Sequence, residues 1–246
     1  MVIGSNLIFY NELPSTNTEA SLLLKTGEQT EGTVIHTDFQ SAGKGQAGNK
    51  WESEKGKNLL FSVILYPQSI SPYDQFLISM TISLGICDFL DRLCTGARIK
   101  WPNDIYLGNG KIAGILIENS ILGTMIETSV AGIGLNINQD NFASILPRPV
   151  SLKMATGKEY SISACLLELL SDLDRRYKHL LYGDRNLIKH DYLARLYRFM
   201  EWSSFSSAGS VFTGRIKDVL ISGQIRIEEK GGLTREFSFK EFSYLS

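Results

Sequence analysis

Cysteine and histidine are scarce in this chain of 246 residues. There are three cysteines, an odd number, and no Cys-x-x-Cys pair, which excludes a disulfide framework. The three histidines are scattered, without a partner at the spacing that zinc ligands need. We therefore expect reduced thiols, a cytoplasmic location and no fixed metal site formed by the protein.

The chain also lacks an excess of charge of one sign and a long hydrophobic run. Its 25 Lys and Arg residues and 26 Asp and Glu residues give a formal net charge of −1. No overall positive field therefore attracts it to nucleic acid or to an acidic membrane surface. The N-terminus has no basic segment followed by a long apolar one, so we expect no signal peptide. The most apolar helical stretch, Phe76 to Leu90, is too short to span a membrane and contains Asp88.

The pattern of apolar residues predicts an α+β body with a mixed or antiparallel sheet. Thr16 and Glu19 have the spacing of a capping box, so a helix is expected to begin at Thr16. Strands are predicted at 33–39, 58–66, 97–101, 105–107, 112–117 and 129–137. Further helices are predicted at about 71–93, 166–183 and 187–197.

After Trp202 the composition changes. Residues 203–209 are rich in serine and are predicted to form a linker. Short β-like runs separated by glycines follow at 211–216, 224–229 and 235–239. We therefore predict a main domain at 1–200 and a small β domain at 201–246.

A glycine-rich loop at 43–51 is the most informative segment. Its three glycines and two lysines can present N–H groups and cations to one anion, and Trp51 can lie against a flat ring. The run G-K-G-Q-A-G at 43–48 satisfies G-x-G-x-x-G, but a dinucleotide site needs a helix directly after the loop. Here a predicted strand follows. A P-loop is excluded too, because Gly48 is followed by Asn49 and not by Lys and Ser or Thr.

Three later segments accompany this loop. In K-W-P-N-D at 100–104, polar residues cluster around a proline that ends a strand. In G-K-I-A-G-I-L-I-E at 110–118, Gly114 interrupts an apolar strand, which indicates close approach of a ligand or another backbone. In G-I-G-L-N-I-N at 132–138, two glycines alternate with Ile and Leu, and we expect them to leave a slot that side chains do not fill.

Together with the run S-T-N at 15–17, these segments resemble the catalytic domain of the biotin–protein ligases, over roughly residues 8 to 245. The resemblance implies a class II synthetase-like α+β domain followed by a small SH3-like β-barrel. It also implies a form without the N-terminal DNA-binding domain that some members carry, and a weak homodimer.

The activity that the resemblance implies has two steps. Biotin and ATP, with Mg²⁺, first give biotinyl-5′-AMP and pyrophosphate. The biotinyl group then passes to one lysine of a biotin carboxyl carrier domain. No nucleic acid and no membrane is expected as a partner.

The resemblance also implies which residues bind biotin. The ureido end would be held by Ser15, Thr16, Asn17 and Gln40. The carboxylate and the phosphate would be wrapped by Gly43, Lys44, Gly45 and Gln46. The floor of the biotin slot would be formed by Gly114, Gly132 and Gly134.

The remaining implied roles concern the nucleotide and the chemistry. The nucleotide would be bound by Trp51, Asn103, Lys111 and Asn136. Lys111 would also bind the biotin carboxylate, and Lys44 would help it to neutralise charge during the attack on the α-phosphorus. Asp104 would accept the proton of the acceptor lysine, although capping of an ordinary turn is an equally good interpretation of this residue.

The loop departs from the usual G-R-G-R-x-G-R-x-W pattern of the family. Lys44, Gln46 and Asn49 stand where arginine is usual. Lys cannot form the bidentate fork that Arg makes to phosphate, and Gln and Asn carry no charge. We therefore expect Lys44 and Lys111 to supply the positive charge.

Two alternatives remain open. A lipoate ligase or octanoyltransferase resembles the same fold, but the polar set of Ser15, Thr16, Asn17 and Gln40 favours a ureido head over an alkyl chain. A non-catalytic biotin-binding regulator is the second alternative, and the presence of Lys111 and Asp104 argues against it.

Overall fold

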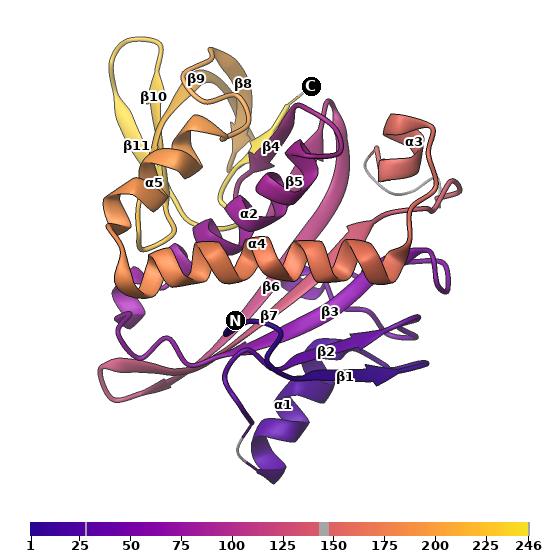
Figure 1. Cartoon of the computed structure of the whole chain (residues 1–246). Coiled ribbons are helices and arrows are strands. Elements are labelled where there is room, and N and C mark those ends of the chain that lie inside the picture. Colours follow the sequence, from indigo (N-terminus) through magenta and orange to yellow (C-terminus); the bar gives the residue numbers. More distant parts are fainter. Residues whose placement is uncertain (28, 143–147, 246) are drawn as a thin grey trace.

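The computed structural model describes residues 1–27, 29–142 and 148–245 (Figure 1). The helices are α1 (Thr16–Thr26), α2 (Phe76–Asp91), α3 (Leu152–Thr156), α4 (Ile162–Tyr182) and α5 (Arg185–Ala194), with 3-10 turns η1 (Gln46–Gly48) and η2 (Pro72–Asp74). The strands of the main sheet are β1 (Leu7–Tyr10), β2 (Val34–Thr37), β3 (Asn58–Leu65), β4 (Ala97–Lys100), β5 (Asp104–Leu107), β6 (Gly110–Leu122) and β7 (Met125–Asn136). The strands of the second sheet are β8 (Ser203–Ser207), β9 (Ser210–Val219), β10 (Ile225–Glu229), β11 (Thr234–Phe237) and β12 (Ser243–Tyr244).

The main sheet has seven strands in the order β1-β2-β3-β7-β6-β5-β4. The pair β1–β2 is parallel and the other neighbours are antiparallel. The predicted α+β class with a mixed sheet is therefore confirmed. The sequence did not predict strand β1, the short helix α3 or the outer half of the β6–β7 hairpin.

Alternation along the central strands divides the sheet into two faces. On β3 and β7, Phe61, Val63, Ile133 and Leu135 belong to the large core, over which α2 and α4 lie (Figure 1). The residues between them point to the other face, on which α1 packs. There Ile64 belongs to a small second core with Leu13, Ala20, Ile35 and Val130. The glycines of β6 and β7 lie on this α1 face, since they alternate with the large-core residues.

The start of α1 differs from the predicted capping box. Ser15 is the N-cap residue and makes no side-chain capping bond, while Thr16 is already helical. Glu19 instead accepts a hydrogen bond of 2.9 Å from Tyr10 Oη. The helix is confirmed, but Thr16 is free to turn its hydroxyl toward the sheet, where Gln40 and Ser62 lie.

The β6–β7 hairpin is longer than predicted, and its pairing has two parts. From Ala113–Leu135 to Ser120–Thr128 the register is continuous, which places Gly114 opposite Gly134. A register shift follows between Ser120 and Ile121, beyond which the hairpin continues to its tip.

The C-terminal strands form an antiparallel five-stranded sheet in the order β11-β10-β9-β8-β12. The predicted linker at 203–209 is wrong, because these residues form β8 and the turn after it. Phe205 is fully buried there, and period-two alternation turns the neighbouring serines outward. The boundary at 200/201 stays a prediction.

The second sheet packs beside the turn that carries K-W-P-N-D. Trp101 Nε1 donates a hydrogen bond of 3.0 Å to the Gly223 carbonyl, and the Trp101 ring stacks on Phe242 with centroids 5.3 Å apart. The peptide bond between Trp101 and Pro102 is cis. Both sheets contribute to one continuous hydrophobic core. Within the described part of the chain, no helix combines the length and the apolar character needed to cross a membrane.

Candidate active site

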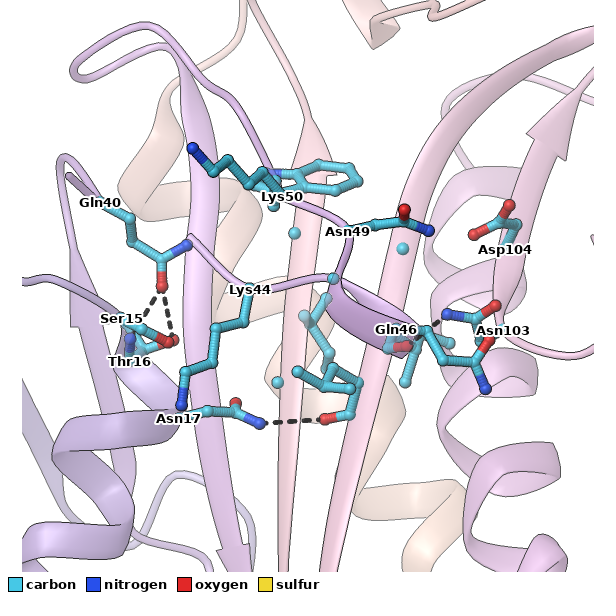
Figure 2. A pocket seen from close by; sticks show the side chains of 18 of the residues that line it. Ser15, Thr16, Asn17, Gln40, Lys44, Gln46, Asn49, Lys50, Asn103 and Asp104 are labelled. Carbon is cyan, nitrogen blue, oxygen red and sulfur yellow. Dashed lines mark hydrogen bonds between the residues drawn. The ribbon is translucent and has the colours of Figure 1, made fainter. Parts of the chain in front are cut away.

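A cavity of about 130 Å³ opens on the α1 face of the sheet, between α1, the glycine loop and the hairpin β5–β6 (Figure 2). It is lined by most of the residues that the sequence predicted for biotin, nucleotide and chemistry. These are Ser15, Thr16, Asn17, Gln40, Lys44, Gly45, Gln46, Trp51, Asn103, Asp104, Lys111, Gly114, Gly132 and Gly134. Segments from Ser15 to Gly134, far apart in the sequence, therefore meet at one place.

The glycine loop is closed on itself by backbone hydrogen bonds. Gly45 N donates to Asn49 O at 2.7 Å, and Trp51 N donates to Gly43 O at 3.0 Å. A Cβ on Gly43 would overlap the Trp51 carbonyl, so a glycine is needed for this closure. No helix of dinucleotide-binding length follows the loop, because residues 49–57 lead directly into β3.

The slot expected above the strand glycines is not empty. A Cβ on Gly114 would lie 2.9 Å from Trp51 Cζ3, and one on Gly134 would overlap Trp51 Cε2. A Cβ on Gly132 would overlap Asn17 Oδ1. The expectation that side chains leave the slot unfilled is therefore wrong. The glycines instead allow the Trp51 indole and the Asn17 amide to lie directly on the sheet.

At one end of the cavity the side chains form a chain of hydrogen bonds, of which Figure 2 draws the contacts between Thr16 and Gln40. Thr16 N donates to Gln40 Oε1 at 2.8 Å, and Thr16 Oγ1 lies 3.1 Å from the same oxygen. Ser62 Oγ lies 2.7 Å from Thr16 Oγ1 and 2.6 Å from Asn17 Oδ1. Asn17 Nδ2 donates to Glu118 Oε2 at 2.7 Å. The side chains of Thr16, Asn17 and Gln40 at this end are uncharged and rich in donors and acceptors, and the Lys44 side chain extends toward them (Figure 2).

At the other end, Lys111 Nζ forms an ion pair of 2.6 Å with Asp104 Oδ1. Strand pairing explains the contact, since β5 and β6 are antiparallel neighbours in which Lys111 stands opposite Tyr106. Lys111 Nζ also lies 5.6 Å from the centre of the Trp51 ring. The Lys111 ammonium thus lies between the Asp104 carboxylate and the face of the Trp51 ring. In this position it can also bind an anion of a ligand.

Lys44 does not share that place. Figure 2 shows its side chain extended toward Ser15 and Asn17, away from Asp104. The residue is exposed, so the long side chain can swing between the two ends of the cavity. Its predicted contact with phosphate stays a prediction.

Asn103 and Asn136 occupy different environments. Asn103 lines the cavity, but its Nδ2 donates to Ile115 O at 2.9 Å and ties the K-W-P-N-D turn to β6. Asn136 is buried at the end of β7 and does not line this cavity; its Nδ2 donates to Val150 O at 3.1 Å. Its Oδ1 is buried without a hydrogen-bond partner among the described residues.

Several lining residues were not predicted. Asn49, Lys50, Ile115, Leu116 and Ile133 also contribute to the lining, although Ile115 and Ile133 belong to the large core on the other face of the sheet. Lys50 precedes Trp51 in a loop already rich in lysine, which was a usable signal. Ser62 and Glu118 sit behind Asn17, and nothing in their own sequence context distinguishes them from ordinary strand residues.

Lys100, the first residue of K-W-P-N-D, points away from the cavity. Its Nζ donates to Tyr106 Oη at 3.0 Å and lies 4.6 Å and 5.0 Å from the ring centres of Tyr106 and Tyr244. Burial lowers the pKa of Lys100, and the Asp104 charge partly opposes this effect. Tyr244 belongs to β12, so the C-terminal sheet reaches the strand that ends at the active-site turn.

The donor set does not resemble a resident metal centre. In the described ranges, no group of three or more His, Cys, Asp or Glu side chains could hold a metal ion.

Comparison with known proteins decides the family. The profile of the biotin/lipoate A/B protein ligase family matches residues 10–138, more than half of the chain. The chain belongs to this family. The matched residues include the glycine loop and the three later segments, so the family predicted from them is confirmed.

Individual ligases of the family resemble the chain over most of its length. The biotin–[acetyl-CoA-carboxylase] ligase of Paracoccus denitrificans is 33% identical over 196 residues, which cover 76% of this chain and 79% of that protein. The bifunctional ligase/repressor BirA of Bacillus spizizenii is 30% identical over 185 residues, which cover 72% and 55%. The biotin protein ligase from Aquifex aeolicus, solved in complex with biotin and ATP, has a TM-score of 0.81 at 26% identity, covering 97% of this chain and 98% of that chain.

The chain spans 55% to 65% of the length of the ligase/repressor relatives from Bacillus and Escherichia. The fold is shared throughout with the Aquifex ligase, including the second sheet.

Proposed function

We propose that this protein is a biotin–protein ligase, which activates biotin with ATP and transfers it to a lysine of a biotin carboxyl carrier domain. One observation carries the proposal. A single cavity has the uncharged hydrogen-bonding side chains of Thr16, Asn17 and Gln40 at one end and a lysine–carboxylate pair at its other end. Biotin has the same arrangement, with a ureido group at one end and a carboxylate at the other.

The uncharged side chains at this end support biotin over lipoate or octanoate. A ureido group offers two N–H donors and one carbonyl acceptor, and an alkyl chain offers none. Thr16 and Asn17 are paired within the protein, whereas the Gln40 NH₂ group donates to none of the described residues, so burying it against an alkyl chain would cost about 1–3 kcal/mol. Our proposal therefore assigns this end to the ureido ring.

The first step joins two anions, so its main requirements are positioning and charge neutralisation. Lys111 is placed to contact both the biotin carboxylate and the α-phosphate. Lys44 and the N–H groups of the glycine loop can add to it from the opposite side. ATP brings Mg²⁺, which supplies further positive charge at the phosphates.

Trp51 would separate biotin from the nucleotide base or pack against the adenylate. Its indole already lies on Gly114 and Gly134, so a bound adenylate would either stack on its outer face or displace it. We assign Asn103 to the nucleotide side of the cavity. We assign Asn136 to the nucleotide side too. Its unpaired Oδ1 would accept a hydrogen bond when the adenylate binds.

The second step needs a neutral acceptor lysine. With a pKa of about 10.4, an ordinary lysine pays about 4.6 kcal/mol to lose its proton at pH 7. Asp104 lies at the cavity and can take this proton once Lys111 contacts the phosphate. The amine then attacks the acyl carbon, and AMP leaves.

The remaining parts of the proposal follow from the reaction. The partner is a biotin carboxyl carrier domain that presents one acceptor lysine. A weak homodimer and a cytoplasmic location stay predictions.

The test is an assay of pyrophosphate release with biotin and MgATP, followed by transfer of labelled biotin to a purified carrier domain. We expect both activities to depend on biotin. Activity only with lipoate or octanoate would favour the related ligases. Tight biotin binding without pyrophosphate release would favour a binding regulator.

A further inference from the structure

Asp104 begins β5 and has a lysine on each of the two strands that pair with β5. Lys111 comes from β6 and forms the ion pair of 2.6 Å with the carboxylate. Lys100 ends β4 and is the direct cross-strand partner of Asp104. Such partners carry their side chains on the same face of the sheet, with Cβ atoms about 5 Å apart. Lys100 does not line the cavity, and the functions assigned above do not include it.

The two lysines differ in how firmly their ammonium groups are held. Lys111 Nζ faces the cavity, where an anion of a ligand can attract it away from Asp104. Lys100 Nζ donates a hydrogen bond of 3.0 Å to Tyr106 Oη and lies 4.6 Å and 5.0 Å from the ring centres of Tyr106 and Tyr244. The hydrogen bond and the two aromatic faces favour the charged amine and restrict its position. Lys111 is thus the movable cation and Lys100 the fixed one.

The two tyrosines that hold Lys100 are themselves well packed. Tyr106 is buried, and its ring centre lies 5.6 Å from that of Tyr197. Tyr244 packs against Phe205 with ring centres 5.6 Å apart, and its strand β12 pairs with β8. The Lys100 ammonium is therefore held by one ring from the main sheet and one from the second sheet.

Other charged and titratable groups also surround Asp104 and Lys100. They are Lys111, Tyr106, Tyr197, Tyr244, Arg148 and Arg198. Tyrosines are uncharged near neutral pH, Arg148 is exposed, and Arg198 donates to Leu245 O at 2.8 Å. Burial lowers the pKa of Lys100, and the charge of Asp104 opposes this lowering. The attraction is mutual, so the Lys100 ammonium favours the carboxylate form of Asp104.

The need for a fixed cation arises in the second step of the proposed reaction. Once Lys111 contacts the phosphate of the adenylate, Asp104 loses its ion pair and has a phosphate nearby. Negative charge close to a carboxylate favours its protonated form. A protonated Asp104 cannot take the proton of the acceptor amine. Lys100 keeps its place at Tyr106 and Tyr244 and opposes this loss of charge.

We propose that Lys100 is a positioning residue for acyl transfer, the fixed counter-ion that keeps Asp104 ionised after Lys111 has turned to the phosphate. Through Tyr244, the second sheet contributes to this step without touching the substrate. The inference rests on the proposed ligase function, with Asp104 as the base of its second step.

The test compares variants of Lys100 over a range of pH. Lys100→Met keeps the length of the side chain and removes its charge, Lys100→Gln is a second uncharged variant, and Lys100→Arg keeps the charge. The matched control is Lys189→Met, because Lys189 Nζ forms an ion pair of 2.9 Å with Asp218 and also joins the main domain to the second sheet. Single-turnover transfer from preformed biotinyl-5′-AMP to a purified carrier domain is measured from pH 5 to pH 9. Pyrophosphate exchange is measured on the same preparations.

We expect Lys100→Met and Lys100→Gln to move the midpoint of the acid limb of transfer upward by about 0.5 to 1 pH unit. Transfer should then be about three- to tenfold slower below the midpoint and change less than about twofold at pH 9. Pyrophosphate exchange should change less than about twofold at each pH. Lys100→Arg and Lys189→Met should keep the wild-type midpoint. In an Asp104→Asn background, Lys100→Met should change transfer less than about twofold, since the base is already absent.

An equal loss of transfer at every pH would overturn the inference, because it would show a merely structural effect on the K-W-P-N-D turn. An unchanged midpoint in both uncharged variants would also overturn it, as would a further loss in the Asp104→Asn background. Absence of biotin-dependent pyrophosphate release in the wild-type protein would contradict the proposed function itself.

Discussion

The ammonium of Lys111 lies 2.6 Å from Asp104 Oδ1, and each side chain is about one quarter exposed, 26% and 23%. The pair is therefore open to the cavity. A phosphate that engages Lys111 competes with Asp104 for the same cation. Adenylate formation would thus free the carboxylate for the step in which a proton acceptor is needed.

This relationship gives the first prediction. Asp104→Asn should slow transfer from preformed adenylate to the carrier about 10²- to 10⁴-fold, the usual contribution of a general base, and slow adenylate formation less than about threefold. Lys111→Gln should slow adenylate formation about 10²- to 10³-fold, since it removes a group that stabilises developing charge. Single-turnover transfer and pyrophosphate exchange measure the two steps separately. Equal losses in both steps for Asp104→Asn would contradict its role as a base.

The second prediction concerns the glycines beneath Trp51. Gly134→Ala should displace the indole from the sheet, because the new methyl group would overlap Trp51 Cε2. We expect a shift in tryptophan fluorescence and at least tenfold weaker adenylate binding, about 1.4 kcal/mol or more. Gly27→Ala is the matched control, since no atom lies within 4 Å of the added Cβ. Unchanged fluorescence in Gly134→Ala would show that the indole is held elsewhere.

The third prediction concerns the missing arginines. Gln46→Arg adds a guanidinium to the wall of the cavity, and a charge-assisted hydrogen bond to phosphate contributes about 1.5–3 kcal/mol. Dissociation of biotinyl-5′-AMP should slow about 10- to 100-fold, measured by chasing labelled adenylate. Gln68→Arg, on an exposed position outside the cavity, controls for net charge. The same dissociation rate in both variants would exclude Gln46 from the phosphate site.

The fourth prediction is about stability and pH. Tyr192 is fully buried, its hydroxyl has no partner among the described residues, and burial raises its pKa well above 10. Because the pKa of Tyr192 is higher in the folded state than in the unfolded state, the folded protein keeps this proton to a higher pH. The contribution of the neutral Tyr192 to the free energy of unfolding is therefore complete below pH 10 and is lost as the pH rises above 10.

Tyr192→Phe should therefore raise the free energy of unfolding at pH 7 by about 1 kcal/mol, because the unpaired hydroxyl is removed. Above pH 10 the free energy of unfolding should fall less steeply in the variant than in the wild type. The difference between the two slopes should be up to about 1.4 kcal/mol per pH unit. Urea unfolding at pH 7, 10 and 11 measures both effects. Destabilisation at pH 7 would indicate that the hydroxyl has a partner.

Much of the fold could be read from the sequence because apolar periodicity and glycine positions report local structure. The central strands β3 and β7 were predicted because long apolar runs bounded by turn residues are typical of buried strands. Strand β8 was missed, since a single buried Phe205 among serines gives no periodic signal. The capping box was misassigned because the hydroxyl of Thr16 is engaged by Gln40 and Ser62, which lie far away in sequence.

The sequence predicted most of the residues that line the cavity, but it did not predict how their side chains contact one another. Motif spacing brought the lining residues together, yet it could not show that Trp51 covers Gly134 or that Asn17 covers Gly132. Both contacts depend on strand register and on the closure of the loop. Ser62 and Glu118 carry no motif at all, and only their distances to Asn17 distinguish them.

The register shift between Ser120 and Ile121 divides the β6–β7 hairpin into two halves that differ in their tolerance of inserted or deleted residues. In the half that carries the glycines, adding or deleting one residue would turn the glycines to the opposite face of the sheet. The apolar core residues would then point into the cavity. Beyond the shift, no residue of the tip lines the cavity. Hairpins of different tip length can therefore be grafted onto this scaffold without rebuilding its binding surface.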